Sequence, residues 1–200
     1  MTEPKPIRDA VHFFGRFLAK PGQVGAVLPS SKALAQELVG DLSDLRPGDL
    51  VVEYGPGTGA ITRRIAEVLP RGVEYLGIEL EQSFVRKLAV HFPRLHFHHG
   101  SVADVESILT EAGLGAPRRI VSGLPFASLP RSVQDAVVDG TGRILAGGGE
   151  FRTFQYVHAY RMGTAQRFRA AMEARFAQAE RSRPVVRNVP PAFVLRYWNP

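Results

Sequence analysis

The sequence predicts an α/β domain built on a mostly parallel sheet. From residue 50 onward, short apolar runs of strand length alternate with apolar residues at helical spacing. A glycine-rich turn directly follows the first of these runs, as in nucleotide-binding α/β domains. The 200 residues suit a single domain over 1–200, in which residues 1–40 form a helical appendage and residues 45–200 form the core.

Composition excludes several classes of protein. Hydrophobic residues make up 44% and charged residues 22%, as in soluble globular proteins. We find no run of about 18 apolar residues that would span a bilayer. The absence of cysteine excludes disulfides and thiolate metal sites, and Met1–Pro6 lacks the apolar core of a signal peptide. We therefore expect a cytoplasmic protein.

The positive charge is concentrated at the carboxyl end. The formal net charge is +6, and residues 161–200 hold eight arginines against only two acidic residues, Glu173 and Glu180. Such a basic end indicates an anionic partner, either nucleic acid or a lipid surface, or else a solvated helix face. The eight arginines are Arg161, Arg167, Arg169, Arg175, Arg181, Arg183, Arg187 and Arg196.

Residues 7–20 have the pattern of an amphipathic helix. Ile7, Val11, Phe14 and Leu18 recur at helical spacing, and Pro21-Gly22 ends the pattern. Basic residues follow one another at every fourth position, which favours a helix that lies in a lipid interface; they are Arg8, His12, Arg16 and Lys20, with histidine counted among them. A second helix is expected after Ser30 or Ser31, either of which can cap it.

The core is expected to alternate strands and helices. Predicted strands are Leu50–Tyr54, Tyr75–Glu79, Leu95–His98, Ile120–Ser122 and Glu150–Tyr156. Predicted helices follow the glycine turn (Ile61–Leu69) and cover residues 81–91, Val102–Leu109 and Ser132–Leu145. The chain then predicts a helix over Ala165–Ala179 and an antiparallel pair formed by Val185–Val186 and Phe193–Tyr197.

The turn over residues 53–59 carries the strongest functional signal. Gly55, Gly57 and Gly59 follow a strand and open a helix, so the backbone can approach a ligand closely. Glu53 lies two residues before the first of these glycines, and Glu79 ends the next strand, where an acid can bind the ribose hydroxyls of an adenosine group.

The turn also allows two other interpretations. With Ala60 it also fits the Gly-x-Gly-x-x-Gly/Ala pattern of an NAD site, and a structural turn is a third reading. An NAD site presents its helix N-terminus to an anionic diphosphate, beside which the carboxylate of Glu53 is poorly placed. The same carboxylate suits a cationic ligand such as S-adenosylmethionine, which carries a sulfonium and an ammonium group.

The segment Glu-Tyr-Gly-Pro-Gly-Thr-Gly resembles motif I of class I methyltransferases. Nearly the whole chain is similar to the bacterial phospholipid N-methyltransferases, which are relatives of the ribosomal RNA adenine dimethylases. The resemblance also includes three other segments, Val24–Ser31, Ser122–Pro125 and Asn188–Ala192.

This resemblance implies a Rossmann-like sheet of seven strands in the order 3-2-1-4-5-7-6, with S-adenosylmethionine bound over the strand ends. Ser101 stands where relatives usually have Asp, which leaves the contact to the adenine amine without a carboxylate. Asp104 is an alternative acceptor. The residues implied for the cofactor are Glu53, Gly55, Gly57, Thr58, Gly59, Glu79, Leu80, Ser101, Val102 and Ser122.

The methyl acceptor is predicted to be a lipid amine. The RNA dimethylases carry Asn-Leu-Pro-Tyr or Asn-Leu-Pro-Phe after strand four, where this chain has Gly123, Leu124, Pro125 and Phe126. A site that reads a base loses its polar contact when Asn is replaced by Gly, although Phe126 remains available for stacking. The chain also lacks length for the C-terminal helical domain that those enzymes normally add.

We therefore expect N-methylation of phosphatidylethanolamine and its methylated intermediates toward phosphatidylcholine, by a peripheral protein on an anionic membrane surface. The alternatives are an RNA adenine methyltransferase, a small-molecule methyltransferase and an inactive cofactor-binding module. No metal is expected, because His91, His96, His98 and His99 lack an acid at ligand spacing. Candidates to orient the amine, relay its proton or bind the lipid phosphate are Tyr156, His158, Tyr160, Arg161 and Arg187.

Overall fold

The computed structural model describes residues 30–200. The predicted helix over residues 7–20 and most of the Val24–Ser31 segment lie outside the described residues. The helices are α2 (Lys32–Val39), α3 (Ala60–Val68), α4 (Gln82–His91), α5 (Val105–Glu111), α6 (Arg131–Ile144) and α7 (Gly163–Glu173), with short 3₁₀ turns η1 (Val102–Asp104), η2 (Phe126–Ser128) and η3 (Val157–Ala159). The strands are β1 (Leu50–Tyr54), β2 (Glu74–Glu79), β3 (His96–His99), β4 (Arg119–Ser122), β5 (Gly149–Tyr156), β6 (Gln178–Arg181) and β7 (Ala192–Asn199).

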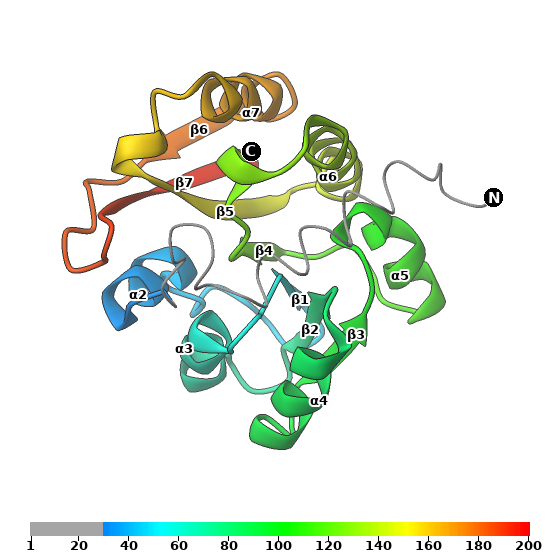
Figure 1. The fold of residues 1–200 in the computed structure, drawn as a ribbon. Helices are drawn as coiled ribbons and strands as arrows, with labels where there is room; N and C mark the ends of the chain where they lie inside the picture. Colours follow the sequence, from blue (N-terminus) through cyan, green and yellow to red (C-terminus); the bar gives the residue numbers. More distant parts are fainter. Residues whose placement is uncertain (1–29) are drawn as a thin grey trace.

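The strands form one seven-stranded sheet in the order β3-β2-β1-β4-β5-β7-β6 (Figure 1). The first five strands are parallel, and β7 runs antiparallel between β5 and β6. This confirms the predicted fold class. Because the five parallel strands end at the same edge, the turns that follow them meet there.

Helices cover both faces of the sheet (Figure 1). One buried cluster lies under α2 and α3 and includes Leu38, Ile65 and Phe154. The other lies under α5, α6 and α7 and includes Ile108, Val137 and Phe168. Strands buried on both faces explain why their sequences are continuous apolar runs.

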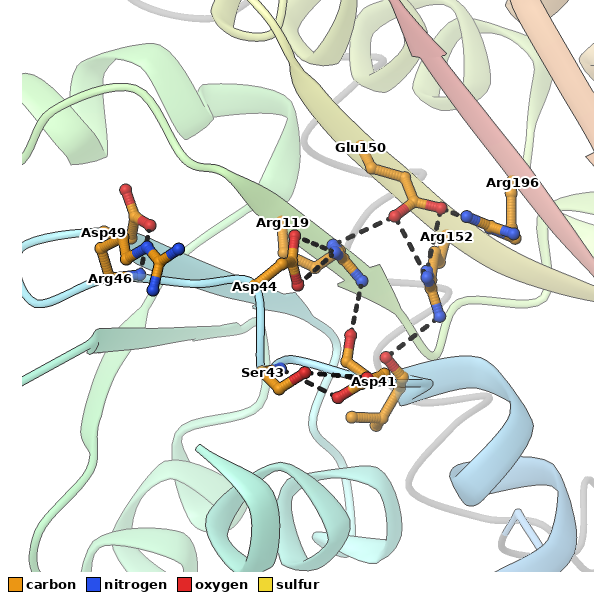
Figure 2. A network of polar contacts seen from close by, with 10 residues as sticks. Asp41, Ser43, Asp44, Arg46, Asp49, Arg119, Glu150, Arg152 and Arg196 are labelled. Carbon is orange, nitrogen blue, oxygen red and sulfur yellow. Dashed lines mark hydrogen bonds and ion pairs between the residues drawn. The ribbon is translucent and has the colours of Figure 1, made fainter. Parts of the chain in front are cut away.

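A buried ionic network ties α2 to the opposite, amino-end edge of the sheet (Figure 2). Glu150 contacts the guanidinium groups of Arg119 and Arg152 at 3.2 and 3.1 Å, and Arg196 also pairs with it. Arg152 additionally donates to the carbonyl of Val39 at the end of α2. Burial raises the pKa of Glu150, but the neighbouring guanidinium groups outweigh that effect and hold the pKa below its usual value.

Two predictions for the carboxyl end were wrong. The helix expected over Ala165–Ala179 ends at Glu173, and residues 178–181 form the edge strand β6. All four β6 residues are exposed, so the strand lacks the apolar alternation by which strands are found in sequence. The expected strand Val185–Val186 is reduced to one isolated bridge between Val185 and Ala192.

Glu150→Gln should destabilise the fold. The change leaves buried guanidinium groups without their carboxylate, which typically costs about 3–5 kcal/mol. Urea unfolding measures the effect. Glu67→Gln is the control, because it breaks the exposed Arg64–Glu67 pair and should cost no more than about 1 kcal/mol. Equal losses in the two variants would contradict a structural role for the network.

Candidate active site

The glycine turn between β1 and α3 has the backbone shape that the sequence predicts. Gly55, Gly57 and Gly59 have φ angles of 67°, 55° and 83°, in the left-handed region that favours glycine. Gly59 is the N-cap of α3. Thr58, at the tip of the turn, is exposed. The turn therefore exposes backbone at the end of β1, where a ligand can approach it.

Glu53 is held beneath this turn by two hydroxyl groups. The Tyr75 hydroxyl donates to its Oε2 atom at 2.5 Å, and the Thr62 hydroxyl donates to the same atom at 2.8 Å. Tyr75 comes from β2, and Thr62 comes from the first turn of α3. The orientation of this carboxyl group is thus fixed by the two elements on either side of the glycine turn.

The second oxygen of Glu53, Oε1, is buried and has no hydrogen-bond partner among the described residues. The residue is 0% exposed, and burial raises its pKa to about 7, against the effect of the two hydroxyl donors. An unpaired buried acceptor of this kind fits a ligand that brings a positive charge or a hydrogen-bond donor.

Glu79 joins the end of β2 to the glycine turn. Its Oε2 atom accepts from the Gly57 N–H and its Oε1 atom accepts from the Glu81 N–H, both at 2.9 Å. Burial raises the pKa of this carboxyl group. Each carboxylate oxygen can accept a further hydrogen bond, so Glu79 keeps capacity for hydroxyl groups such as those of a ribose.

A small cavity of about 40 Å³ lies next to Glu79. The Ser101 hydroxyl accepts from the Ala103 N–H at 3.2 Å, so the residue caps η1 and also lines the cavity. Several of the predicted cofactor residues meet here, on the turns that follow β1, β2 and β3. The lining residues are Gly55, Ile78, Glu79, Leu80, Gly100, Ser101, Val102, Leu124, Leu129 and Val133.

The turn after β4 is tightly packed. A Cβ atom on Gly123 would lie 3.0 Å from the Gly55 carbonyl oxygen, so a larger residue would require the Gly55 backbone to shift by a few tenths of an ångström. Phe126 is fully buried and stacks on Phe168 with ring centroids 4.2 Å apart. Ser122 is also buried, and its hydroxyl accepts from the Leu124 N–H. This turn therefore offers neither a polar side chain nor a free aromatic face at the positions used by RNA dimethylases.

The predicted acceptor residues divide between the two faces of the sheet. Tyr156, at the end of β5, packs with the cluster under α2, and its ring stacks on that of His158 at 5.6 Å and 10°. Burial raises the pKa of Tyr156, which keeps its hydroxyl protonated. Tyr160 packs on the other face, where the Arg169 guanidinium lies 3.7 Å from its ring centre. Only Tyr156 and His158 are thus brought together.

Arg161 and Arg187 are both exposed and lie on different loops. Next to Arg187, the side chain of Asn188 accepts from the Ser31 N–H at 2.9 Å and donates to the Pro190 carbonyl. The loop after β6 is thereby fixed to the start of α2. Ser31 also caps that helix, as the sequence predicts.

Sequence reasoning missed the residues that hold the site in shape, namely Thr62, Tyr75, Gln134 and Asn188. Gln134 donates to the carbonyls of Phe126 and Leu129 and fixes the turn after β4. One sequence signal could have identified Thr62. It is a polar residue within the apolar stripe of a helix, between Ile61 and Ile65. Within residues 30–200, no group of acidic and histidine side chains is arranged to hold a metal ion.

Comparison with known proteins gives sequence relatives. The chain is 30% identical over 148 residues to an ornithine lipid N-methyltransferase from Singulisphaera acidiphila, over 72% of this chain and 77% of that protein. It is 37% identical over 87 residues to a ribosomal RNA small subunit methyltransferase A from Laribacter hongkongensis, over 42% of this chain and 30% of that protein. No family model matches the chain.

Solved structures agree on the fold. The fibrillarin of Aeropyrum pernix, in complex with natively bound S-adenosyl-L-methionine, superposes with a TM-score of 0.56 at 13% identity. The superposition covers 82% of this chain and 73% of fibrillarin. At this identity the likeness concerns the fold alone.

Glu53→Gln should remove a pH dependence of stability. The raised pKa means that Glu53 stabilises the folded chain below its unfolded pKa of about 4.5, and that this stability is lost as pH rises through about 7. Between about pH 5 and pH 8, the free energy of unfolding should fall by up to about 3 kcal/mol more in the wild type than in the variant. Urea unfolding at several pH values measures this difference, and a difference that stays constant with pH would contradict it.

The glycine turn, Glu53 and Glu79 predict S-adenosylmethionine as the cofactor, and the resemblance predicts the sheet order. The sequence relatives are methyltransferases, which agrees with that prediction. A match that covers more than two thirds of a relative at 30% identity indicates common descent. The chain therefore belongs to the class I methyltransferases that use S-adenosylmethionine as their cofactor.

Proposed function

We propose that the protein transfers methyl groups from S-adenosylmethionine to the amine of a membrane phospholipid, phosphatidylethanolamine and its methylated intermediates. The observation that carries this proposal is the extent of the match to the lipid N-methyltransferase, which covers 77% of that relative. The ribosomal RNA relative is matched over only 30% of its length. Ornithine lipid, after which the first relative is named, and phosphatidylethanolamine both carry an amine.

The turn after β4 supports a lipid rather than a base. Gly123 supplies no polar side chain, and a Cβ atom built at this position would lie only 3.0 Å from the Gly55 carbonyl oxygen. Phe126 stacks on Phe168 inside the core and is unavailable to a base. An adenine base bound here would find no polar side chain for its amine and no aromatic side chain on which its ring could stack.

The cofactor is assigned to the cavity beside Glu79 and to the glycine turn. We assign the ribose hydroxyls to Glu79 and the adenine to the walls formed by Leu80, Ser101 and Val102. The ammonium of the methionine part is assigned to the unpaired Oε1 atom of Glu53. Thr58 is too exposed for a central role, and Ser122 acts through the turn that it supports.

The acceptor amine is assigned to the ends of β4 and β5. S-adenosylmethionine supplies an electrophilic methyl group on a good leaving group, so the protein mainly has to align the amine and exclude water. An ammonium has no lone pair, and it must lose a proton before attack. We propose that the His158 imidazole accepts this proton. The hydroxyl of Tyr156 stays protonated and is therefore not the acceptor, but the Tyr156 ring holds the imidazole by stacking. Arg161 and Arg187 remain candidates for the lipid phosphate.

Cofactor binding should depend on pH through Glu53. Below about pH 7 the carboxyl group is neutral, and a cationic ligand must displace its proton. The affinity for S-adenosylmethionine should therefore rise about tenfold from pH 6 to pH 8 in the wild type. Isothermal titration calorimetry measures it, and Glu53→Gln is the control because both proteins share the titration of the ligand. An equal rise in both proteins would remove Glu53 from the site.

The acceptor is tested by incubating the full chain with methyl-labelled S-adenosylmethionine and one of three acceptors. These are phosphatidylethanolamine vesicles, ornithine lipid vesicles and ribosomal RNA. We expect label in phosphatidylethanolamine, and His158→Ala should lower kcat by about 100-fold or more while the Kd for the cofactor stays unchanged.

The three acceptors separate the alternatives. Label in RNA alone would replace the proposal by an RNA adenine methyltransferase. Label in ornithine lipid alone would keep a lipid amine and change its identity. Glu111→Ala, at the end of α5, is the matched control, because its side chain is exposed and is not among the residues that line the assigned cavity.

A further inference from the structure

Two loops at one side of the sheet combine exposed apolar and basic side chains. We call them the β5/β7 rim, defined as residues 157–162 after β5 and 183–191 before β7. The Val157 N–H donates to the Pro191 carbonyl at 2.9 Å, which joins the two loops. Figure 1 shows both loops on the side of the molecule where α2 lies.

The rim holds most of the large apolar side chains that are exposed in residues 30–200. They are Val157, Met162, Val186 and Val189, and the remaining one is Val90 on α4. Val186 is 70% and Val189 is 67% exposed. Single exposed apolar residues are ordinary, but four of them on two loops that are joined by a hydrogen bond favour a binding surface.

Positive charge accompanies these apolar side chains. Arg161, Arg183 and Arg187 are exposed on the same loops, and no ion pair joins them to another described residue. The rim itself contains no acidic residue. Glu37 and Glu180 line the groove behind the loop, but Glu180 is paired with Arg196. The rim thus offers net positive charge beside apolar side chains.

We propose that the β5/β7 rim docks on an anionic phospholipid bilayer, with Val186 and Val189 entering the interface and Arg183 and Arg187 contacting the headgroups. A bilayer accepts both kinds of contact at once: apolar side chains enter the boundary between headgroups and acyl chains, and each basic residue near an anionic surface contributes about 1 kcal/mol. Nucleic acid would use the arginines but leave the valines and Met162 without a partner.

The position of the rim connects docking to catalysis. Tyr156 is the residue before the first loop, and its strand partner is Ala192, directly after the second loop. A bilayer on the rim therefore lies next to the residues assigned to the amine. The link between docking and catalysis rests on the proposed lipid acceptor. The docking itself can be measured without any methyl transfer.

The test uses the full chain and vesicles in a sedimentation assay. One set of vesicles contains phosphatidylglycerol and phosphatidylethanolamine, and the other contains phosphatidylcholine alone. The double variant Arg183→Glu/Val186→Glu should bind the anionic vesicles about tenfold or more weakly than the wild type. The wild type should bind phosphatidylcholine weakly, and its binding to anionic vesicles should fall as salt is added.

The matched control is Arg71→Glu/Val90→Glu. It makes the same change in net charge, and Val90 is 78% exposed, so it also removes one exposed valine, at a distance from the rim. This control should bind the vesicles within about twofold of the wild type. Thermal unfolding and the Kd for S-adenosylmethionine should be unchanged in both variants.

Equal vesicle binding by the rim variant and the wild type would overturn the docking surface, and so would a wild type that does not bind anionic vesicles. Loss of RNA binding with vesicle binding intact would instead make the rim a nucleic-acid surface. A short-chain phosphatidylethanolamine, dispersed as monomers, separates the two proposals: the rim variant should methylate it at the wild-type rate. Vesicle binding without methylation of any lipid would overturn the proposed function and leave the rim standing.

Discussion

A carboxyl group that is fully withdrawn from water is stable only when it is neutral or when it meets a positive charge. Glu53 is in this position, with one oxygen held by Tyr75 and Thr62 and the other without a partner. The glycine turn, the start of α3 and the middle of β2 all meet around this group. Their arrangement keeps an unsatisfied acceptor at the end of β1, which is where we propose that the cationic part of the cofactor binds.

The parallel strands give the rest of the site its layout. Turns after β1, β2 and β3 enclose the cavity beside Glu79, while the end of β5 and the start of β7 carry the proposed acceptor pair and the β5/β7 rim. The antiparallel strand β7 allows this division, because it brings the 183–191 loop to the same edge as the end of β5. The sites that we propose for cofactor and acceptor therefore occupy neighbouring parts of one edge.

Helix α2 is held at both of its ends, by different kinds of contact. Its N-cap, Ser31, is tied to Asn188 in the loop before β7, and its last residue, Val39, is tied to Arg152 in the buried ionic network. Glycine is favoured at position 40, because its φ angle of 65° is strained for other residues and a Cβ atom there would displace the Arg152 guanidinium. The network lies at the amino-end edge of the sheet, so it stabilises the fold without occupying the ligand edge.

The sequence by itself determined the parallel sheet, the glycine turn and the positions of Glu53 and Glu79 at the strand ends, because buried strands, left-handed glycines and strand-end carboxylates each have a local signature. It missed β6, whose exposed residues carry no apolar pattern, and the roles of Tyr75 and Gln134, since a contact between distant segments has no local sign. Only the tertiary structure separated Tyr156 from Tyr160 and buried Phe126 against Phe168, because the face on which a side chain lies depends on how the strands and helices pack.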